Sequence, residues 1–352
     1  MRPNILRSYL QFPVYRYYHI VLFGFTAFDL RFPPEAENMA NGPVSTDWNS
    51  HEGEGFVSIG NRRVHINVSG PARERNQPFI ICEAGHGDSS YVWAAMQSRT
   101  AQFARILTYD RAGMGQSDPG PNPRTAAAAA KDLSDLLDAA KLSGPFVVVS
   151  HSYGGIIARE FLHIRNRDIS GMVFVDTITE LYSTENWLPM KEFGAVLGNL
   201  NFWDVTGITS THKFTETEWE SINKTWPNDE STSAAEEESI RLSEQNLASK
   251  DQCESQLLGN RPITVIKGNA TQDFRNVLAA GEAAGNGTAS DRETIRQFVK
   301  TSEEARERHQ RSQLRLSANA RFVVAQHGHH MVQFVEPDLI AEEIKNILRI
   351  VV

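Results

Sequence analysis

Short apolar runs rich in β-branched residues recur along this chain, and most are followed by a glycine-containing turn or a helical segment. The runs are FIICE, ARILTY, FVVVS, GMVFVD, PITVIK and ARFVVAQ. They show no alternation of apolar and polar residues, so both faces of each strand are expected to be covered, as in a parallel sheet. Helical segments lie between most of them. The pattern therefore predicts an α/β fold with a mostly parallel, doubly wound sheet.

The 352 residues divide into three predicted parts. Residues 1–54 are expected to form an N-terminal arm and a linker, because 33–54 are rich in Pro, Gly, Asn and acids. Residues 55–180 and 259–352 are assigned to the α/β core. Residues 181–258 separate two strands by more than a bare loop would span, and are predicted to form a helical cap. The cap is rich in large aromatic residues, most expected in its own small core and one or two in a pocket; they include Trp187, Phe193, Phe202, Trp203, Phe214, Trp219 and Trp226.

Charge and composition exclude some functions and leave others open. A formal net charge of −8 argues against nucleic acid as a partner, because binding to phosphates needs a basic surface. Cys82 and Cys253 are too few and too distant to form a disulfide framework. The apolar stretch within residues 1–32 is about half the length needed to cross a bilayer. Membrane contact, secretion and packing on the domain stay open for it; a cytoplasmic location is favoured, and the oligomeric state is not predicted.

Ser152 stands in the sequence SHSYGG, where a buried-type strand changes into a helix. A serine between small residues at such a junction fits a nucleophile elbow, in which a strained turn exposes the hydroxyl at the carboxyl end of a sheet. Ser150 and Gly154 are small enough for the strand and the helix to approach each other. An ordinary strand-to-helix turn is the alternative, since short motifs recur by chance.

The motifs EAGHG, YDRAGMGQSD, SHSYGG, VFVD and HHMVQFVEPDLI occur in that order over residues 56–352. In this respect the chain resembles the α/β-hydrolases. The resemblance implies an α/β-hydrolase fold with a cap between the later strands, and a Ser–His–acid triad with Ser152 as the nucleophile. Ser150 is a departure, because the family usually has glycine there. A serine nucleophile argues against the haloalkane dehalogenases and epoxide hydrolases, which use aspartate.

The resemblance also implies a catalytic histidine after the last strand, ahead of a proline that opens the terminal helix. Aligning HMVQFVEPDL without a gap gives His330, and His329, which follows Gly328, is the alternative. The base would take the proton from the serine and return it to the leaving group. A metal site at His327, His329 and His330 is disfavoured, because no carboxylate or cysteine lies at ligand spacing.

The third member is a carboxylate that holds the imidazole in one tautomer. The family most often places it in the loop after PITVIK, where Asp273 comes slightly late. The other place is the end of VFVD, which is Asp176, and Asp176 is preferred. The predicted oxyanion hole uses the backbone N–H groups of Tyr153 and His86.

These residues predict a serine hydrolase that cleaves an ester, lactone or related acyl bond of a small, largely apolar substrate through an acyl-enzyme. The alternative is a non-hydrolytic protein on the same fold, either a small-molecule receptor or a lyase or cyclase. No cofactor is expected, because GHG and GMG lack the spacing of phosphate-binding loops. Asp110 and Arg111 are interpreted as residues that anchor the loops at the rim of the sheet.

Overall fold

The computed structural model describes residues 46–185, 187–225, 230–327 and 329–352. Residues 1–45, which include the apolar N-terminal stretch, and Trp226 lie outside the described residues, so the expectations that concern them stay predictions. Within the described part, no helix is long and apolar enough to span a membrane.

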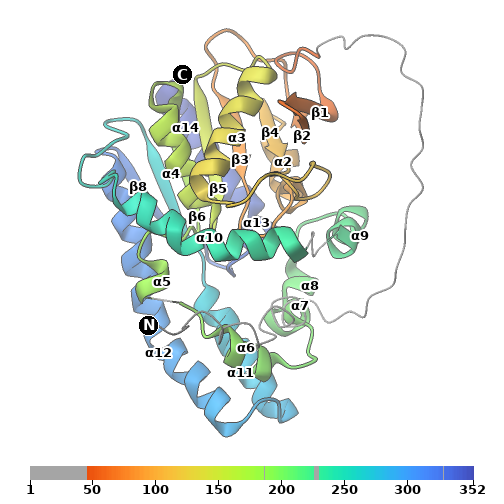
Figure 1. The fold of residues 1–352 in the computed structure, drawn as a ribbon, viewed down its shortest axis with the longest axis vertical. Helices are drawn as coiled ribbons and strands as arrows, with labels where there is room; N and C mark the ends of the chain where they lie inside the picture. Colours follow the sequence, from red (N-terminus) through yellow and green to blue (C-terminus); the bar gives the residue numbers. More distant parts are fainter. Residues whose placement is uncertain (1–45, 186, 226–229, 328) are drawn as a thin grey trace, which may run out of the picture.

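The described residues form one eight-stranded sheet (Figure 1). In spatial order the strands are β1 (Gly53–Ile59), β2 (Arg62–Ser69), β4 (Ile106–Tyr109), β3 (Phe79–Glu83), β5 (Phe146–His151), β6 (Ile169–Val175), β7 (Ile263–Lys267) and β8 (Ala320–Val324). Strand β2 pairs antiparallel with both β1 and β4, and all other neighbours are parallel, which confirms the predicted mostly parallel sheet. Gly60, in the left-handed region at φ 62°, turns the β1–β2 hairpin.

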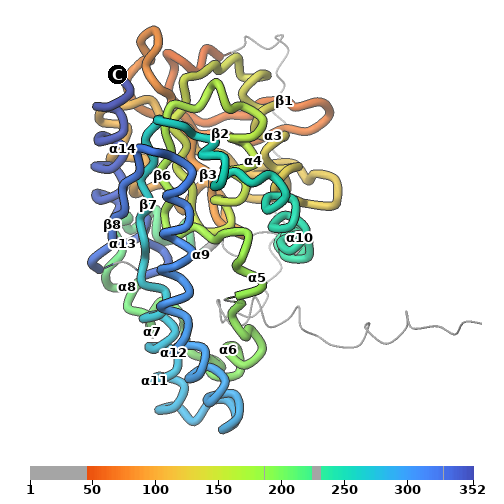
Figure 2. The backbone as a smooth tube through the Cα atoms, turned by 90° about the vertical axis from the view of Figure 1, so that its left-hand side faces the viewer, coloured from red at the N-terminus to blue at the C-terminus, as the bar shows by residue number. Residues whose placement is uncertain are grey.

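Helices cover both faces of the sheet, as the doubly wound prediction requires. Figure 2 shows α14 (Pro337–Val351) on one side, and α3 (Ala126–Ala139) with α4 (Gly154–Ile164) on the other. Helix α2 (Ala94–Thr100) packs against α14. All residues of β3, β4, β5 and β7 are buried, which explains why their sequences do not alternate.

Two helical insertions lie beyond the carboxyl ends of the strands. The first, between β6 and β7, contains α5 (Tyr182–Glu185), α6 (Met190–Leu197), α7 (Phe202–Thr206), α8 (Ile208–Thr211), α9 (Glu216–Thr225) and α10 (Glu230–Ala248). The second, between β7 and β8, is an antiparallel pair, α11 (Ala270–Ala284) and α12 (Ala289–Ser312), which packs on α6 (Figure 1). The predicted cap, 181–258, contains the helices of the first insertion. The second insertion lies within 259–352, the segment assigned to the α/β core, and packs against the first.

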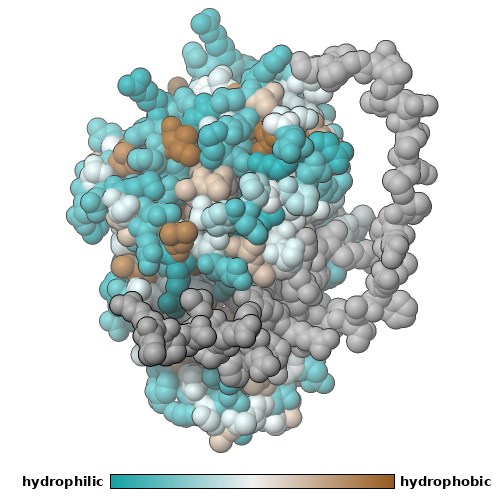
Figure 3. All heavy atoms as spheres, in the orientation of Figure 1, coloured by the Kyte–Doolittle hydropathy of each residue, from teal (hydrophilic) through white to brown (hydrophobic). Residues whose placement is uncertain are grey.

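The remaining elements are short: η1 (Ser90–Trp93), η2 (Asn166–Asp168), η3 (Gln313–Leu316) and α13 (Val332–Val335). On the face drawn in Figure 3, hydrophilic residues dominate and hydrophobic ones lie apart from one another. The large apolar side chains gather instead in the core and beneath the two insertions.

Candidate active site

Ser152 lies in a sharp turn between β5 and α4, with its backbone in the left-handed region at φ 51°. A non-glycine residue seldom adopts this conformation, so the turn is strained. The glycines after it allow close packing: a Cβ on Gly154 would lie 2.6 Å from the carbonyl oxygens of Glu83 and Ala84. The turn therefore has the geometry of the predicted nucleophile elbow.

His330 is the histidine that reaches Ser152. It lies between β8 and α13, and its Nε2 is 3.1 Å from the Oγ of Ser152. Its Nδ1 is 2.7 Å from Oδ2 of Asp176. His329 faces elsewhere, with its Nδ1 hydrogen-bonded to Asp273. The structure thus brings together Ser152, His330 and Asp176, the three residues preferred from the sequence.

Asp176 follows β6 and is fully buried. Besides His330, its carboxylate accepts hydrogen bonds from the backbone N–H of Gly268 at 3.1 Å and from Arg306 of α12. Burial opposes the ionised form, but the charge of Arg306 and the hydrogen bond from His330 outweigh it and lower the pKa of Asp176 below its ordinary value. The acid is therefore ionised beside the imidazole.

Asp273, the alternative acid, has a different position in the structure. It lies in the first turn of α11 and accepts a hydrogen bond from the backbone N–H of His330 at 2.9 Å. Its other carboxylate oxygen is bonded to His329. Asp273 thus fixes the loop that carries the histidines.

The environment of His330 favours the neutral imidazole. Burial lowers the pKa of His330, and the nearby His151 and Arg306 act in the same direction, while Asp176 opposes them. The rings of His151 and His330 lie 4.7 Å apart between centroids, and Nε2 of His151 donates to the backbone carbonyl of His330 at 3.0 Å. A neutral imidazole at this position can accept the hydroxyl proton of Ser152.

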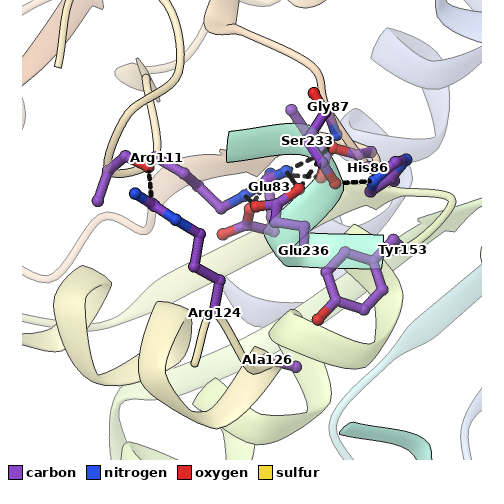
Figure 4. A network of polar contacts seen from close by, with 12 residues as sticks. Glu83, His86, Gly87, Arg111, Arg124, Ala126, Tyr153, Ser233 and Glu236 are labelled. Carbon is purple, nitrogen blue, oxygen red and sulfur yellow. Dashed lines mark hydrogen bonds and ion pairs between the residues drawn. The ribbon is translucent and has the colours of Figure 1, made fainter. Parts of the chain in front are cut away.

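The loop after β3 lies against the same serine. A Cβ on Gly85 would be 3.3 Å from the Cβ of Ser152, so glycine lets the loop pass close to the nucleophile. The imidazole of His86 points toward α10, where its Nε2 donates to the carbonyl of Ser233 at 2.9 Å (Figure 4). Tyr153 is the N-cap of α4, and the N–H groups at such a position have no partner within the helix. The geometry is compatible with the predicted backbone donors.

A buried network joins this loop to α10 (Figure 4). Arg111 contacts Glu236 through Nε at 2.8 Å and Nη2 at 3.0 Å, and Glu83 through Nη1 at 2.9 Å. The same guanidinium donates to the backbone carbonyls of Ala84 and Gly85. Arg111 therefore anchors the loop, as predicted for a residue at the rim of the sheet, but its partner Glu236 was not predicted from the sequence.

A cavity of about 210 Å³ opens at Ser152. Its walls are mostly apolar, and Trp187, Phe193, Phe202 and Trp203, four of the aromatic residues named for the predicted cap, line it, more than the one or two expected from the sequence. The apolar and aromatic lining includes Ile178, Tyr182, Trp187, Leu188, Met190, Phe193, Phe202, Trp203, Ile240, Phe274 and Met331. Phe214 and Trp219 pack instead with Phe334 in a small core. The arrangement suits an apolar group bound next to a nucleophilic hydroxyl.

Polar groups gather at the Ser152 end of this cavity. His86, Asp88, His151 and Arg306 are among the residues that line it. Among the described residues, no group of three or more His, Cys, Asp or Glu side chains is arranged to hold a metal ion.

Comparisons with known proteins agree with this architecture. A model of the alpha/beta hydrolase family matches residues 81–343. A protein of Gibberella zeae, described as an AB hydrolase superfamily protein, is 32% identical over 302 residues, which are 82% of this chain and 92% of that protein. A probable transporter, efuK, of Hormonema carpetanum is 35% identical over 312 residues, which are 86% of this chain; the chain spans 44% of the length of that relative.

Solved structures share the fold at low identity. The enol-lactonase from Burkholderia xenovorans superposes with a TM-score of 0.53 at 17% identity, over 84% of this chain and 100% of that one. A thermophilic esterase from Thermogutta terrifontis gives 0.52 at 17% identity, over 85% and 98%. With the family match over most of the chain, the fold and the elbow identify this protein as a member of the alpha/beta hydrolase family.

Proposed function

We propose that this protein is a serine hydrolase that cleaves an ester, a lactone or a related acyl bond of a small, largely apolar substrate. The observation that carries the proposal is the hydrogen-bonded series from Ser152 through His330 to Asp176, with distances of 3.1 and 2.7 Å, at the end of an apolar cavity. Such a series activates a serine hydroxyl as a nucleophile.

In the proposed mechanism, the Oγ of Ser152 attacks the substrate carbonyl while His330 takes its proton. The imidazolium is stabilised by Asp176, and the backbone N–H groups of Tyr153 and His86 donate to the developing oxyanion. His330 then protonates the leaving alcohol or enol as the carbonyl re-forms. A water molecule, deprotonated by His330, releases the acid from the acyl-enzyme and restores the serine.

Labelling with a fluorophosphonate probe tests the nucleophile directly. We expect wild type to be labelled on Ser152, and Ser152→Ala, folded by circular dichroism, to be unlabelled. Turnover of esters and lactones with increasing apolar acyl groups then tests the substrate class. Absence of labelling and turnover in the folded wild type would contradict the proposal and favour a non-hydrolytic receptor, lyase or cyclase.

A further inference from the structure

Asp176, the acid of the proposed triad, contacts a cationic side chain of the second helical insertion. Helix α12 begins with a complete capping box at Thr288 and Asp291, and it runs for 24 residues past the end of β6. Arg306 on this helix forms an ion pair with Oδ2 of Asp176, the same oxygen that lies 2.7 Å from His330 Nδ1. One turn later, Gln310 donates to the carbonyl of Thr177 at 2.7 Å. Helix α12 therefore contacts both the acid and the backbone of the residue that follows it.

A neutral His330 leaves the charge of Asp176 uncompensated in the resting site. Asp176 has no exposed surface, and a buried carboxylate needs a cationic partner or hydrogen bonds to stay ionised. Gly268 and Gln310 supply dipoles at 3.1 and 3.4 Å, but the full positive charge comes from Arg306. The Arg306 side chain is 11% exposed, and the residue also lines the cavity at Ser152.

Resting on the proposed function, we propose that Arg306 is a positioning residue, which holds the carboxylate of Asp176 aimed at His330 through their ion pair. The contact joins the second helical insertion to the reacting groups, so α12 takes part in setting up the site. The arginine acts through Asp176 and His330, and no bond to the substrate is required of it.

The groups that face His330 define the expected pH effect. They are Asp176 at the end of β6, His151 at the end of β5, Asp273 on α11, which binds the backbone N–H of His330, and Arg306 on α12. Arg306 and His151 disfavour the imidazolium, whereas Asp176 favours it. Removing the arginine charge is therefore expected to raise the pKa of His330 in two ways. A cation that repels the imidazolium is lost, and the Asp176 oxygen that contacted both Arg306 and His330 then contacts His330 alone.

The test measures the rate of fluorophosphonate labelling of Ser152 as a function of pH, because this rate depends on neutral His330 and needs no known substrate. For Arg306→Gln, we expect the midpoint of the acid limb to rise by about one pH unit. Arg306→Lys keeps the charge and is expected to keep the wild-type midpoint. The matched control is Arg308→Gln, which removes an exposed charge from the same helix, where it pairs with Glu185, and should leave the midpoint unchanged.

Each result supports or overturns the inference. An unchanged or lowered midpoint in Arg306→Gln overturns it, and so does an equal rise in Arg308→Gln, which would indicate a general effect of helix charge. If circular dichroism shows that Arg306→Gln is unfolded, Arg306→Ala replaces it as the variant without the charge: a raised midpoint supports the inference, and an unchanged or lowered midpoint overturns it. Failure of the proposed function is distinguishable, because wild type would then show no labelling at any pH.

Discussion

The buried network at Arg111 predicts unequal costs for the loss of its two carboxylates. Glu236 accepts hydrogen bonds from Nε and Nη2 of Arg111 at 2.8 and 3.0 Å, and from the N–H of Gly87 at 3.1 Å. Glu83 accepts one from Nη1 at 2.9 Å and another from the hydroxyl of Tyr109. Both carboxylates are buried, so one guanidinium faces two acids.

The pKa values of Glu83 and Glu236 are shifted in opposite directions. Burial raises the pKa of Glu83, so its charge is the less stable of the pair. Burial also opposes ionisation of Glu236, but the charge of Arg111 outweighs it and lowers the pKa. Glu236→Gln removes the stable charge and turns an amide N–H₂ toward N–H donors, while Glu83 still compensates the arginine. We expect a loss of about 2–3 kcal/mol in the free energy of unfolding, below the ~3–5 kcal/mol for an unpaired buried charge.

Glu83→Gln leaves the two-point contact between Arg111 and Glu236 intact, so its expected loss is about 1 kcal/mol. Urea unfolding at neutral pH, followed by circular dichroism with m-values compared, measures both variants. Glu238→Gln, an exposed change on the same helix α10, is the control and should behave as wild type. An equal loss in Glu83→Gln would refute the reasoning by showing that the two carboxylates compensate Arg111 evenly, and a larger loss would refute it by making Glu83 the main partner.

Three further predictions concern the site. Asp176→Asn should lower kcat for ester hydrolysis by about ten-thousand-fold, because the imidazole is then held in the wrong tautomer. Asp273→Asn, which only loosens the loop, should lower kcat by about tenfold. The reverse order of the two effects would make Asp273 the acid. Because burial lowers the pKa of His330, kcat/KM should fall only as the pH drops through a midpoint below about 6.5, and a higher midpoint would contradict this. Gly154→Ala places a Cβ 2.6 Å from two carbonyl oxygens and should cost about 1–3 kcal/mol in urea unfolding; an unchanged midpoint would contradict the close approach.

The sheet and the three proposed triad residues could be predicted because their signals are local or fixed by chain order. A strand buried on both faces reads as a continuous apolar run, and the elbow serine stands directly between such a run and a helix. Asp176 is also placed by a local signal, because it directly follows a strand that contains the apolar run GMVFV. His330 follows the last strand, where the carboxyl ends of parallel strands meet.

The partners supplied by the insertions could not be predicted in this way. Arg306 lies in the charged sequence EEARERHQR, which is typical of a solvated helix face. Its burial depends on how α12 crosses the end of β6, a tertiary contact that no local pattern records. Glu236 is similar, since it stands beside Glu237 and Glu238 in one acidic run, and only the packing of α10 selects it as the partner of Arg111.

The two insertions hold opposite sides of the proposed site by the same physical means. Helix α10 holds the loop after β3 through Glu236, and α12 holds Asp176 through Arg306. Each contact pairs a charge on an insertion with a charge in the core, and withdrawing the insertion leaves the buried core charge less well compensated. The energy therefore rises steeply when either helix moves away. Each aromatic contact, such as those of Phe202 and Trp203 on α7, is weak on its own and leaves no buried charge behind when it opens, so adjustment of the cavity to its ligand is expected on that wall.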